Sequence, residues 1–158
     1  MNIRIAIPSE ADALTKVAFA AKSHWGYPAH WMAQWQSILT MTPALIAAHE
    51  TYVAEDEERI IGFASLRRDG GGLRLENLFV LPSEMGRGVG RALFRHSQRR
   101  AREMGFAFFE LESDPHASGF YERLGAERIG SSIALLDDKP RGLPVFRCGA
   151  SHESDCDD

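Results

Sequence analysis

Apolar and polar positions alternate along the chain with two different periods, and the changes of period mark the predicted strands and helices. Isoleucines at every second position predict a half-buried first strand over residues 3–7, which Pro8 ends. Ser9 then caps a predicted helix that runs to about residue 22, because a short polar side chain satisfies N–H groups of the first helical turn. Its buried stripe follows helical spacing and consists of Leu14, Val17, Ala18 and Ala21.

Two short helical segments and three strands are predicted in the middle of the chain. They are a helix with Trp31, Met32, Trp35 and Ile38 or Leu39 on one side, a helical turn over 42–48, and strands over 52–54, 60–66 and 73–81. Thr42 followed by Pro43 indicates the start of the helical turn. The acidic residues 55–58 form a predicted turn, and the glycine-rich residues 69–72 are typical of a hairpin turn.

The last third of the chain is predicted to alternate between helix and strand. Its elements are a helix to Met104, a strand over 106–112, a helix that begins at Asp114-Pro115 and a closing strand over 143–148. Gly105 and Gly125 end the two helices, because glycine adopts the left-handed conformation of a helix C-terminus without strain. Ser131, Ser132 and Arg141 are interpreted as parts of a loop, with a place in an acceptor site as the alternative.

The glycine-rich stretch after the central strand is the strongest chemical signal in the sequence. Gly86, Gly88 and Gly90 follow the strand and lead into the next helix. Glycines let the backbone turn tightly and approach a ligand closely, because no Cβ stands in the way. A helix that starts from such a loop directs unpaired backbone N–H groups outward, which favours a bound anion. The stretch therefore indicates a phosphate-bearing cofactor, and an ordinary glycine-rich turn is the alternative.

The residues around these glycines depart from two common phosphate-binding motifs. A P-loop needs Lys and then Ser or Thr after its last glycine, where this chain has Arg91 and Ala92. A dinucleotide fingerprint needs a glycine where Arg91 stands. Residues 85–90, Met-Gly-Arg-Gly-Val-Gly, instead resemble the acetyl-CoA loop of the GNAT superfamily of N-acetyltransferases, Gln/Arg-x-x-Gly-x-Gly/Ala, from which Met85 departs.

A second stretch resembles another motif of the same superfamily, Asn-x-x-Ala-x-x-x-Tyr-x-x-x-Gly-Phe. The residues at its defined positions are Asp114, Ala117, Tyr121, Gly125 and Ala126. The resemblance, specific over residues 73–126, implies an α/β fold of the GNAT type: a mixed twisted sheet with helices on both faces, splayed at the cofactor site. It also implies an N-acetyltransferase that moves the acetyl group of acetyl-CoA directly to an amine.

The resemblance further implies which residues hold the cofactor. The pantetheine arm is expected along the central strand at Leu78, Phe79 and Val80, where a backbone N–H can stabilise the developing oxyanion. The other implied cofactor-binding residues are Gly86, Arg87, Gly88, Val89, Gly90, Arg91 and Asp114. Tyr121 is the implied proton donor to the departing thiolate, because an ordinary tyrosine is a weaker acid than a thiol by only about 2 kcal/mol. Core packing is the alternative role of Tyr121.

The acceptor amine must lose a proton before it attacks, which costs about 4–5 kcal/mol for a lysine-like amine at pH 7. Glu110 and Glu76 are the candidate bases, His24 and His116 are weaker candidates, and solvated or ion-paired carboxylates are the alternative. The ring side chains of His24, Trp25 and Tyr27 are predicted to line the acceptor site, because rings with polar tips commonly line small-molecule pockets. A hydrophobic contact between two helices is the alternative role for this aromatic segment.

Length and charge narrow the class of protein. The chain has 158 residues and a net charge of −4, which fits one domain and gives no reason to expect nucleic acid or a membrane as partner. We expect a single domain over residues 1–150 and a short, acidic, disordered tail over 151–158. Cys148 and Cys156 have neither metal-ligand nor disulfide spacing, which indicates a cytoplasmic protein without a metal site.

Two functions are consistent with this sequence. The favoured hypothesis is acetyl transfer to a small-molecule or peptide amine, and the alternative is an acyl-CoA-binding sensor without turnover. A homodimer is left open.

Overall fold

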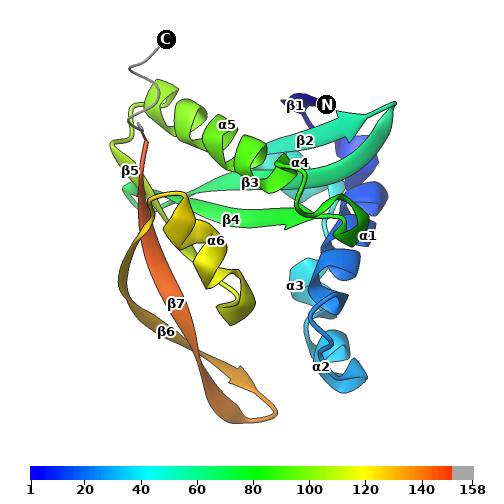
Figure 1. Ribbon diagram of the computed structural model, residues 1–158, viewed down its shortest axis with the longest axis vertical. Helices are drawn as coiled ribbons and strands as arrows, with labels where there is room; N and C mark the ends of the chain where they lie inside the picture. The colour runs from blue at the N-terminus through cyan, green and yellow to red at the C-terminus, as the bar shows by residue number, and fades with distance from the viewer. Residues whose placement is uncertain (151–158) are drawn as a thin grey trace. The chain divides into compact units, whose positions relative to one another are not determined.

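Seven strands form a mixed sheet in the computed structural model, which describes residues 1–150 (Figure 1). The strands are β1 (Asn2–Ile5), β2 (Glu50–Asp56), β3 (Arg59–Asp69), β4 (Gly72–Val80), β5 (Phe108–Glu112), β6 (Glu127–Leu136) and β7 (Lys139–Gly149). Their order in the sheet is β1-β2-β3-β4-β5-β7-β6. β4 and β5 are parallel, with Arg74 opposite Glu110, whereas β1 with β2, β2 with β3, β5 with β7 and β6 with β7 are antiparallel. The predicted mixed sheet is confirmed.

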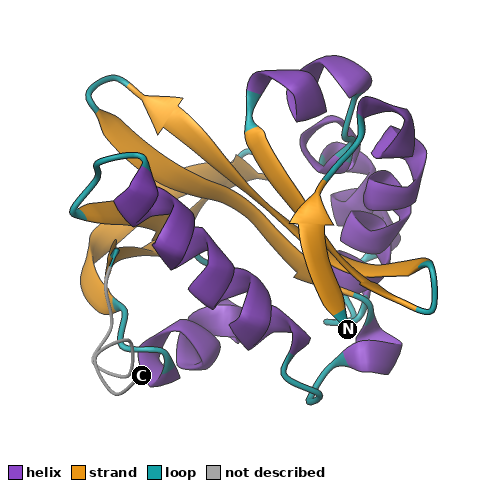
Figure 2. Cartoon of the chain, turned by 90° about the horizontal axis from the view of Figure 1, so that it is seen from above, coloured by secondary structure: helices purple, strands orange, loops and turns teal. Residues whose placement is uncertain are grey.

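Helices and short 3-10 turns connect the strands, purple beside the orange strands in Figure 2. They are η1 (Pro8–Glu10), α1 (Ala11–Ser23), α2 (Ala29–Gln34), α3 (Gln36–Leu39), α4 (Pro43–Ala48), η2 (Pro82–Glu84), α5 (Val89–Glu103), η3 (Pro115–Ala117) and α6 (Ser118–Arg123). The chain divides into two compact units. The first unit contains Met1–Leu66 and Asn77–Phe94, and the second contains Arg67–Glu76 and the chain from Arg95 onward.

The first unit has helices on both faces of its strands. Val53 of β2 and Phe63 of β3 are opposite each other in register and are fully buried in one cluster with Leu14 of α1. Gly62, the residue before Phe63 in β3, faces the opposite side of the sheet, toward α5. A Cβ built on it would lie 3.1 Å from the Leu93 side chain of α5 and 2.9 Å from a β4 carbonyl oxygen. α5 therefore packs so closely on this face that only glycine fits.

The second unit buries its apolar residues between β5, β7 and the helices α5 and α6. Phe109 and Phe146 are fully buried, and the ring of Tyr121 on α6 lies 6.0 Å from that of Phe146. The Gln98 Nε2 of α5 donates a hydrogen bond of 2.8 Å to the carbonyl of Gly149 at the end of β7. These contacts fix α5 and α6 on the apolar side of the β5–β7 pair.

The predicted buried face of the first strand is wrong. Ile5 and Ile7 are 66% and 53% exposed, and the buried residue between them is Ala6. The reason is Arg4, whose guanidinium lies 2.7 Å from the carboxylate of Glu10 and 3.1 Å from that of Glu55. These ion pairs hold the Arg4 side chain on the same side as Ala6, at 30% exposure, and leave Ile5 and Ile7 on the exposed side. Ser9, the predicted helix cap, lies inside η1 instead.

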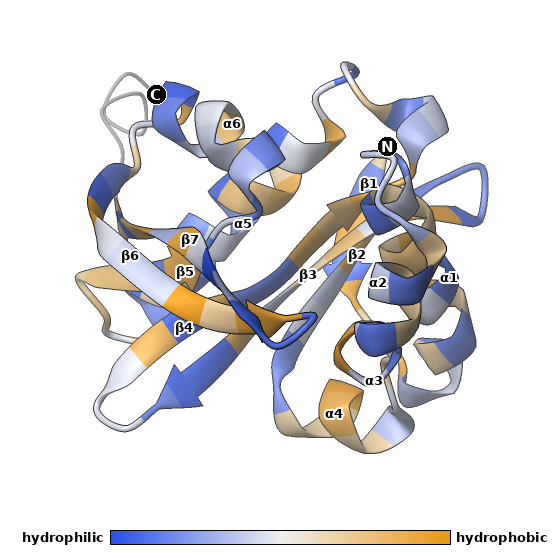
Figure 3. Cartoon of the chain, turned by 90° about the horizontal axis from the view of Figure 1, so that it is seen from below, coloured by the Kyte–Doolittle hydropathy of each residue, from blue (hydrophilic) through white to orange (hydrophobic). Residues whose placement is uncertain are grey.

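The predicted loop before the closing strand is also wrong. Residues 127–142 form β6 and the start of β7, a hairpin whose turn contains Asp137 and Asp138 with φ angles of +54° and +59°. Ile133 and Leu135 on β6 are 75% and 73% exposed, and Figure 3 shows apolar positions in orange along this strand. The apolar alternation of β6 was a usable strand signal.

The predicted second helix is divided into α2 and α3 near Trp35, but Met32, Trp35 and Leu39 pack against one hydrophobic cluster, as the predicted stripe requires. Leu39 is buried, whereas Ile38 is 74% exposed. The predicted start of the next helix is confirmed, because the Thr42 hydroxyl accepts a hydrogen bond of 3.1 Å from the Leu45 N–H. The predicted tail, residues 151–158, lies outside the described residues.

Candidate active site

The glycine loop, residues 85–91, joins η2 to α5 and has the backbone conformation that its glycines predict. Gly86 and Gly88 have φ angles of +80° and +82°, which residues with a side chain rarely adopt. No atom of the described chain lies within 4 Å of a Cβ built on either glycine. The Gly88 carbonyl accepts the first hydrogen bond of α5, from the Ala92 N–H at 3.0 Å. The first N–H groups of an α-helix have no partner inside the helix, so the start of α5 beside these open glycines fits a phosphate group.

Two arginines and a glutamate lie beside this loop. Glu84 in η2 is 8% exposed, and its two carboxylate oxygens accept hydrogen bonds from Arg87 Nη1 at 2.6 Å and Arg59 Nη2 at 2.7 Å. Arg87, a predicted phosphate ligand, is thus held by a carboxylate inside the protein. Sequence analysis missed Arg59 and Glu84, because no local pattern connects the start of β3 with η2.

Residues 78–80, the predicted partners of the pantetheine arm, are the last residues of β4. The Phe79 ring packs into the first unit, 5.7 Å from the ring of Phe63. Just after the strand, the Leu81 N–H donates a hydrogen bond of 2.9 Å to the carbonyl of Ile61. The backbone that would align a cofactor is therefore fixed by side-chain packing and by its bonds to β3.

Tyr121 lies in the second unit, on α6, and is 7% exposed. Its ring contacts the ring of Phe120 at 5.0 Å and that of Phe146 at 6.0 Å. Burial, together with the nearby Cys148 thiol and Asp114 carboxylate, raises the pKa of Tyr121 well above its ordinary value. The hydroxyl therefore keeps its proton at neutral pH and is a hydrogen-bond donor.

Asp114 begins η3, as predicted, and its carboxylate is engaged in its own turn. Oδ1 accepts a hydrogen bond of 2.9 Å from the His116 N–H and lies 3.0 Å from Nδ1 of the same histidine. Asp114 is thus part of the local structure that begins α6. Its cofactor role, and any role of His116 as a base, stay predictions.

Both candidate bases are paired with arginines in the second unit. Glu76 Oε2 lies 3.1 Å from Arg67 Nε and 3.4 Å from Arg74 Nε. Glu110 Oε1 accepts a hydrogen bond of 2.8 Å from Arg147 Nη2. These contacts match the ion-paired alternative that the sequence left open for each carboxylate.

The aromatic segment of the first unit forms a cluster around a lysine. The Tyr27 ring lies 4.9 Å from that of Trp35 and 5.7 Å from that of Trp31. Lys22 Nζ lies 4.3 Å from the centre of the Trp35 ring, a cation–π contact between α1 and the segment after it. His24 and Trp25, the other predicted acceptor residues, contact each other edge to face at 5.0 Å. The Tyr27 contacts match the alternative of a hydrophobic contact between helices.

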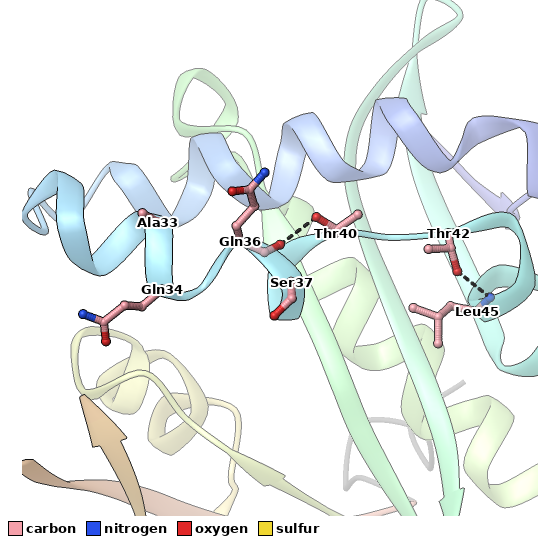
Figure 4. A pocket seen from close by; sticks show the side chains of 7 residues that line it. All are labelled: Ala33, Gln34, Gln36, Ser37, Thr40, Thr42 and Leu45. Atoms are coloured by element: carbon pink, nitrogen blue, oxygen red, sulfur yellow. Dashed lines mark hydrogen bonds between the residues drawn. The ribbon is translucent and has the colours of Figure 1, made fainter. Parts of the chain in front are cut away.

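An open depression of about 570 Å³ lies on α2, α3 and α4 (Figure 4). Its lining residues are Ala33, Gln34, Gln36, Ser37, Thr40, Thr42 and Leu45. The Thr40 hydroxyl donates a hydrogen bond of 2.6 Å to the carbonyl of Gln36, and the Thr42 hydroxyl caps α4. The lining carries no charged group, so the depression offers no ion-pair partner for an ammonium or a phosphate.

Residues 47–125 match the family model of the acetyltransferase (GNAT) domain, which is half of the chain. The chain belongs to the GNAT family. Peptidyl-lysine N-acetyltransferase YiaC of Escherichia coli is 27% identical over 124 residues, which cover 78% of this chain and 81% of that protein. A Bacillus subtilis protein named as an acetyltransferase is 34% identical over 83 residues, 52% of this chain and 56% of that protein, so the match spans little more than half of that relative.

A solved structure supports the same fold for this GNAT chain. PaiA N-acetyltransferase from Thermoplasma acidophilum, in complex with coenzyme A, superposes with a TM-score of 0.75 at 16% identity, over 94% of this chain and 98% of that one. The predictions of the family, of its α/β fold, of an N-acetyltransferase class and of acetyl-CoA as acetyl donor are confirmed. The roles of individual residues stay predictions.

The predicted site residues of this GNAT chain fall into two sets. The first unit contains residues 78–80, the glycine loop and the aromatic segment, and the second contains Glu76, Glu110, Asp114 and Tyr121. Each set combines residues far apart in sequence: the segment after α1 with the end of β4 and the glycine loop in the first, and β4 with β5 and α6 in the second.

Proposed function

We propose that the chain transfers an acetyl group from acetyl-CoA to a primary amine, with the glycine loop as its phosphate site. The observation that carries this proposal is the loop itself. Two alternating glycines with positive φ stand before a 15-residue helix, and no atom of the described chain fills the space at their Cβ positions. The lysine side chain of a peptide is the first acceptor to test, because the E. coli relative is a peptidyl-lysine N-acetyltransferase.

Bound acetyl-CoA would supply an acetyl group activated as a thioester. The N–H groups at the start of α5 would bind its phosphates, and the backbone of residues 78–80 would hold the acetyl carbonyl, where an N–H would stabilise negative charge on the oxygen. The proposed role of the Tyr121 hydroxyl is that of a hydrogen-bond donor, which would stabilise the thiolate of coenzyme A as it departs. Its raised pKa favours a donor that stabilises the thiolate over one that transfers its proton completely.

The acceptor amine must reach the site without its proton. Glu110 and Glu76 are the proposed bases, and the structure shows one oxygen of each carboxylate paired with arginine. His24 and His116 are further candidates. A site that binds the neutral amine directly would need no base, because desolvation lowers the pKa of an ammonium group.

Free-thiol release tests this function directly. The protein is incubated with acetyl-CoA and a panel of amines that includes a lysine peptide, and acetyl-CoA binding is measured in parallel by calorimetry. We expect thiol release that depends on at least one amine, with one acetyl group gained by that amine in mass spectrometry. Tight binding without turnover on any amine would support the sensor instead.

The proposed function also bears on the location of the enzyme in the cell and on its oligomeric state. No helix within residues 1–150 is long and apolar enough to cross a membrane. We propose a cytoplasmic location, where acetyl-CoA and free amines are both present, and a homodimer as an oligomeric state to be tested by sedimentation.

A further inference from the structure

We propose that Arg59, Glu84 and Arg87 form a subsite for the 3′-phosphate of coenzyme A. The proposal rests on the proposed function, since it assumes that the cofactor binds at the glycine loop. It adds a second phosphate-binding feature, made of side chains instead of backbone, and it predicts that the protein distinguishes coenzyme A from 3′-dephospho-coenzyme A.

The three side chains form a compact charged cluster within the first unit. Glu84 accepts one hydrogen bond from each arginine, at 2.6 Å from Arg87 and 2.7 Å from Arg59. Glu84 is one of the few buried charged residues of the described chain, at 8% exposed. The arginine side chains are 62% and 60% exposed. The carboxylate therefore lies inside, and both guanidinium groups reach solvent.

The charges of the cluster favour an anion. Two guanidinium groups and one carboxylate leave a net charge of about +1, since arginine stays protonated at any relevant pH. A guanidinium has five N–H donors, and Glu84 accepts one from each arginine. Both arginine side chains are more than half exposed, so their other N–H donors are accessible to a solute. Such forks suit the oxygens of a phosphate group.

The position of the cluster beside the glycine loop indicates which phosphate of coenzyme A it would bind. Arg87 stands between Gly86 and Gly88, so one of the two arginines belongs to the loop whose N–H groups are proposed to bind the pyrophosphate. Coenzyme A carries one further phosphate, the 3′-phosphomonoester on its ribose. One arginine would neutralise the charge of Glu84, and the second, from the start of β3, leaves the cluster with an excess positive charge that a phosphate can pair with.

Calorimetry with two cofactors tests the subsite without relying on catalysis. Dissociation constants for coenzyme A and 3′-dephospho-coenzyme A are measured for wild type, Arg59→Gln and Arg99→Gln. Arg99 is an exposed arginine of α5 in the second unit, so its substitution removes the same charge elsewhere. We expect wild type and Arg99→Gln to bind coenzyme A about 10- to 100-fold more tightly than the dephospho form, the range for charged hydrogen bonds.

Arg59→Gln should reduce this preference severalfold or more while the affinity for the dephospho form stays unchanged. Equal affinities of the wild-type protein for the two cofactors would overturn the inference, and so would an Arg59→Gln variant that loses the same factor for both. If neither cofactor binds the wild-type protein, the proposed function fails, which is a different outcome. A melting curve of Arg59→Gln confirms that the variant is folded before titration.

Discussion

Replacing Tyr121 by phenylalanine tests whether this residue acts as a hydrogen-bond donor in catalysis or only packs in the core. Phenylalanine keeps the ring contacts with Phe120 at 5.0 Å and Phe146 at 6.0 Å, and it removes only the hydroxyl. The thioester sulfur needs no donor before its bond breaks. Affinity for acetyl-CoA should therefore stay close to that of the wild type, and the turnover rate should fall.

The size of that fall follows from the state of the hydroxyl. Burial raises the pKa of Tyr121, so complete proton transfer to a thiolate costs more than the roughly 2 kcal/mol expected from ordinary pKa values. A hydrogen bond to the developing charge remains, worth about 1.5–3 kcal/mol. Its loss corresponds to a decrease in turnover of about 10- to 150-fold.

Tyr52→Phe is the matched control, because Tyr52 is also buried, at 4% exposed, and lies in β2 of the first unit. Both substitutions should cost about 0.5–1.5 kcal/mol of stability, a drop of a few degrees in melting temperature. Thiol-release kinetics, calorimetry with acetyl-CoA and melting curves are measured for both variants. If turnover of Tyr121→Phe equals that of Tyr52→Phe, Tyr121 has no part in the mechanism.

Three further predictions concern the base, the α5 contact and the N-terminal ion pair. If one of the two candidate carboxylates is the base, either Glu110→Gln or Glu76→Gln should lower kcat/KM about 10²-fold or more and flatten its pH profile, and two near-normal variants would remove both candidates. Gly62→Ala should destabilise the fold by about 1–3 kcal/mol in a denaturant titration, since its Cβ would lie 2.9 Å from the Phe79 carbonyl oxygen and 3.1 Å from the Leu93 side chain of α5, and wild-type stability would show that these neighbours move apart without cost. The hydrogen bond from Arg4 lowers the pKa of Glu10 below its ordinary value of 4.5, so its contribution to stability is present above that pH and is lost as pH falls through the lowered pKa. The stability difference between wild type and Arg4→Met should therefore shrink below about pH 4.5, and a constant difference would contradict this linkage.

Local signals in the sequence predicted the parts of the fold that depend on neighbouring residues. Thr42 caps α4 because its hydroxyl reaches an N–H three residues away. Gly105 and Gly125 end helices with φ angles of +89° and +90°. The conformation of the glycine loop could be predicted in the same way, because it depends on residues that are close together in the sequence.

Features that depend on distant residues could not be predicted in this way. The face of β1 is decided by the ion pair of Arg4 with Glu55, which belongs to another strand. The partner of Glu84 comes from the start of β3, and the pKa of Tyr121 is raised by burial between elements that the sequence does not place together. Alternation along β6 was present but was outweighed by its serines and glycine, which are common in loops.

The melting temperature in the presence of acetyl-CoA tests the central claim, that the glycine loop holds the cofactor. At a concentration 100 times Kd, binding stabilises the folded state by about 2.7 kcal/mol, which raises the melting temperature by about 5–10 °C. Gly88→Asp and Gly88→Asn impose the same strain at a φ angle of +82° and differ only by one charge. We predict a rise for wild type, a smaller rise for Gly88→Asn and none for Gly88→Asp. An equal rise in all three proteins would show that the cofactor binds elsewhere.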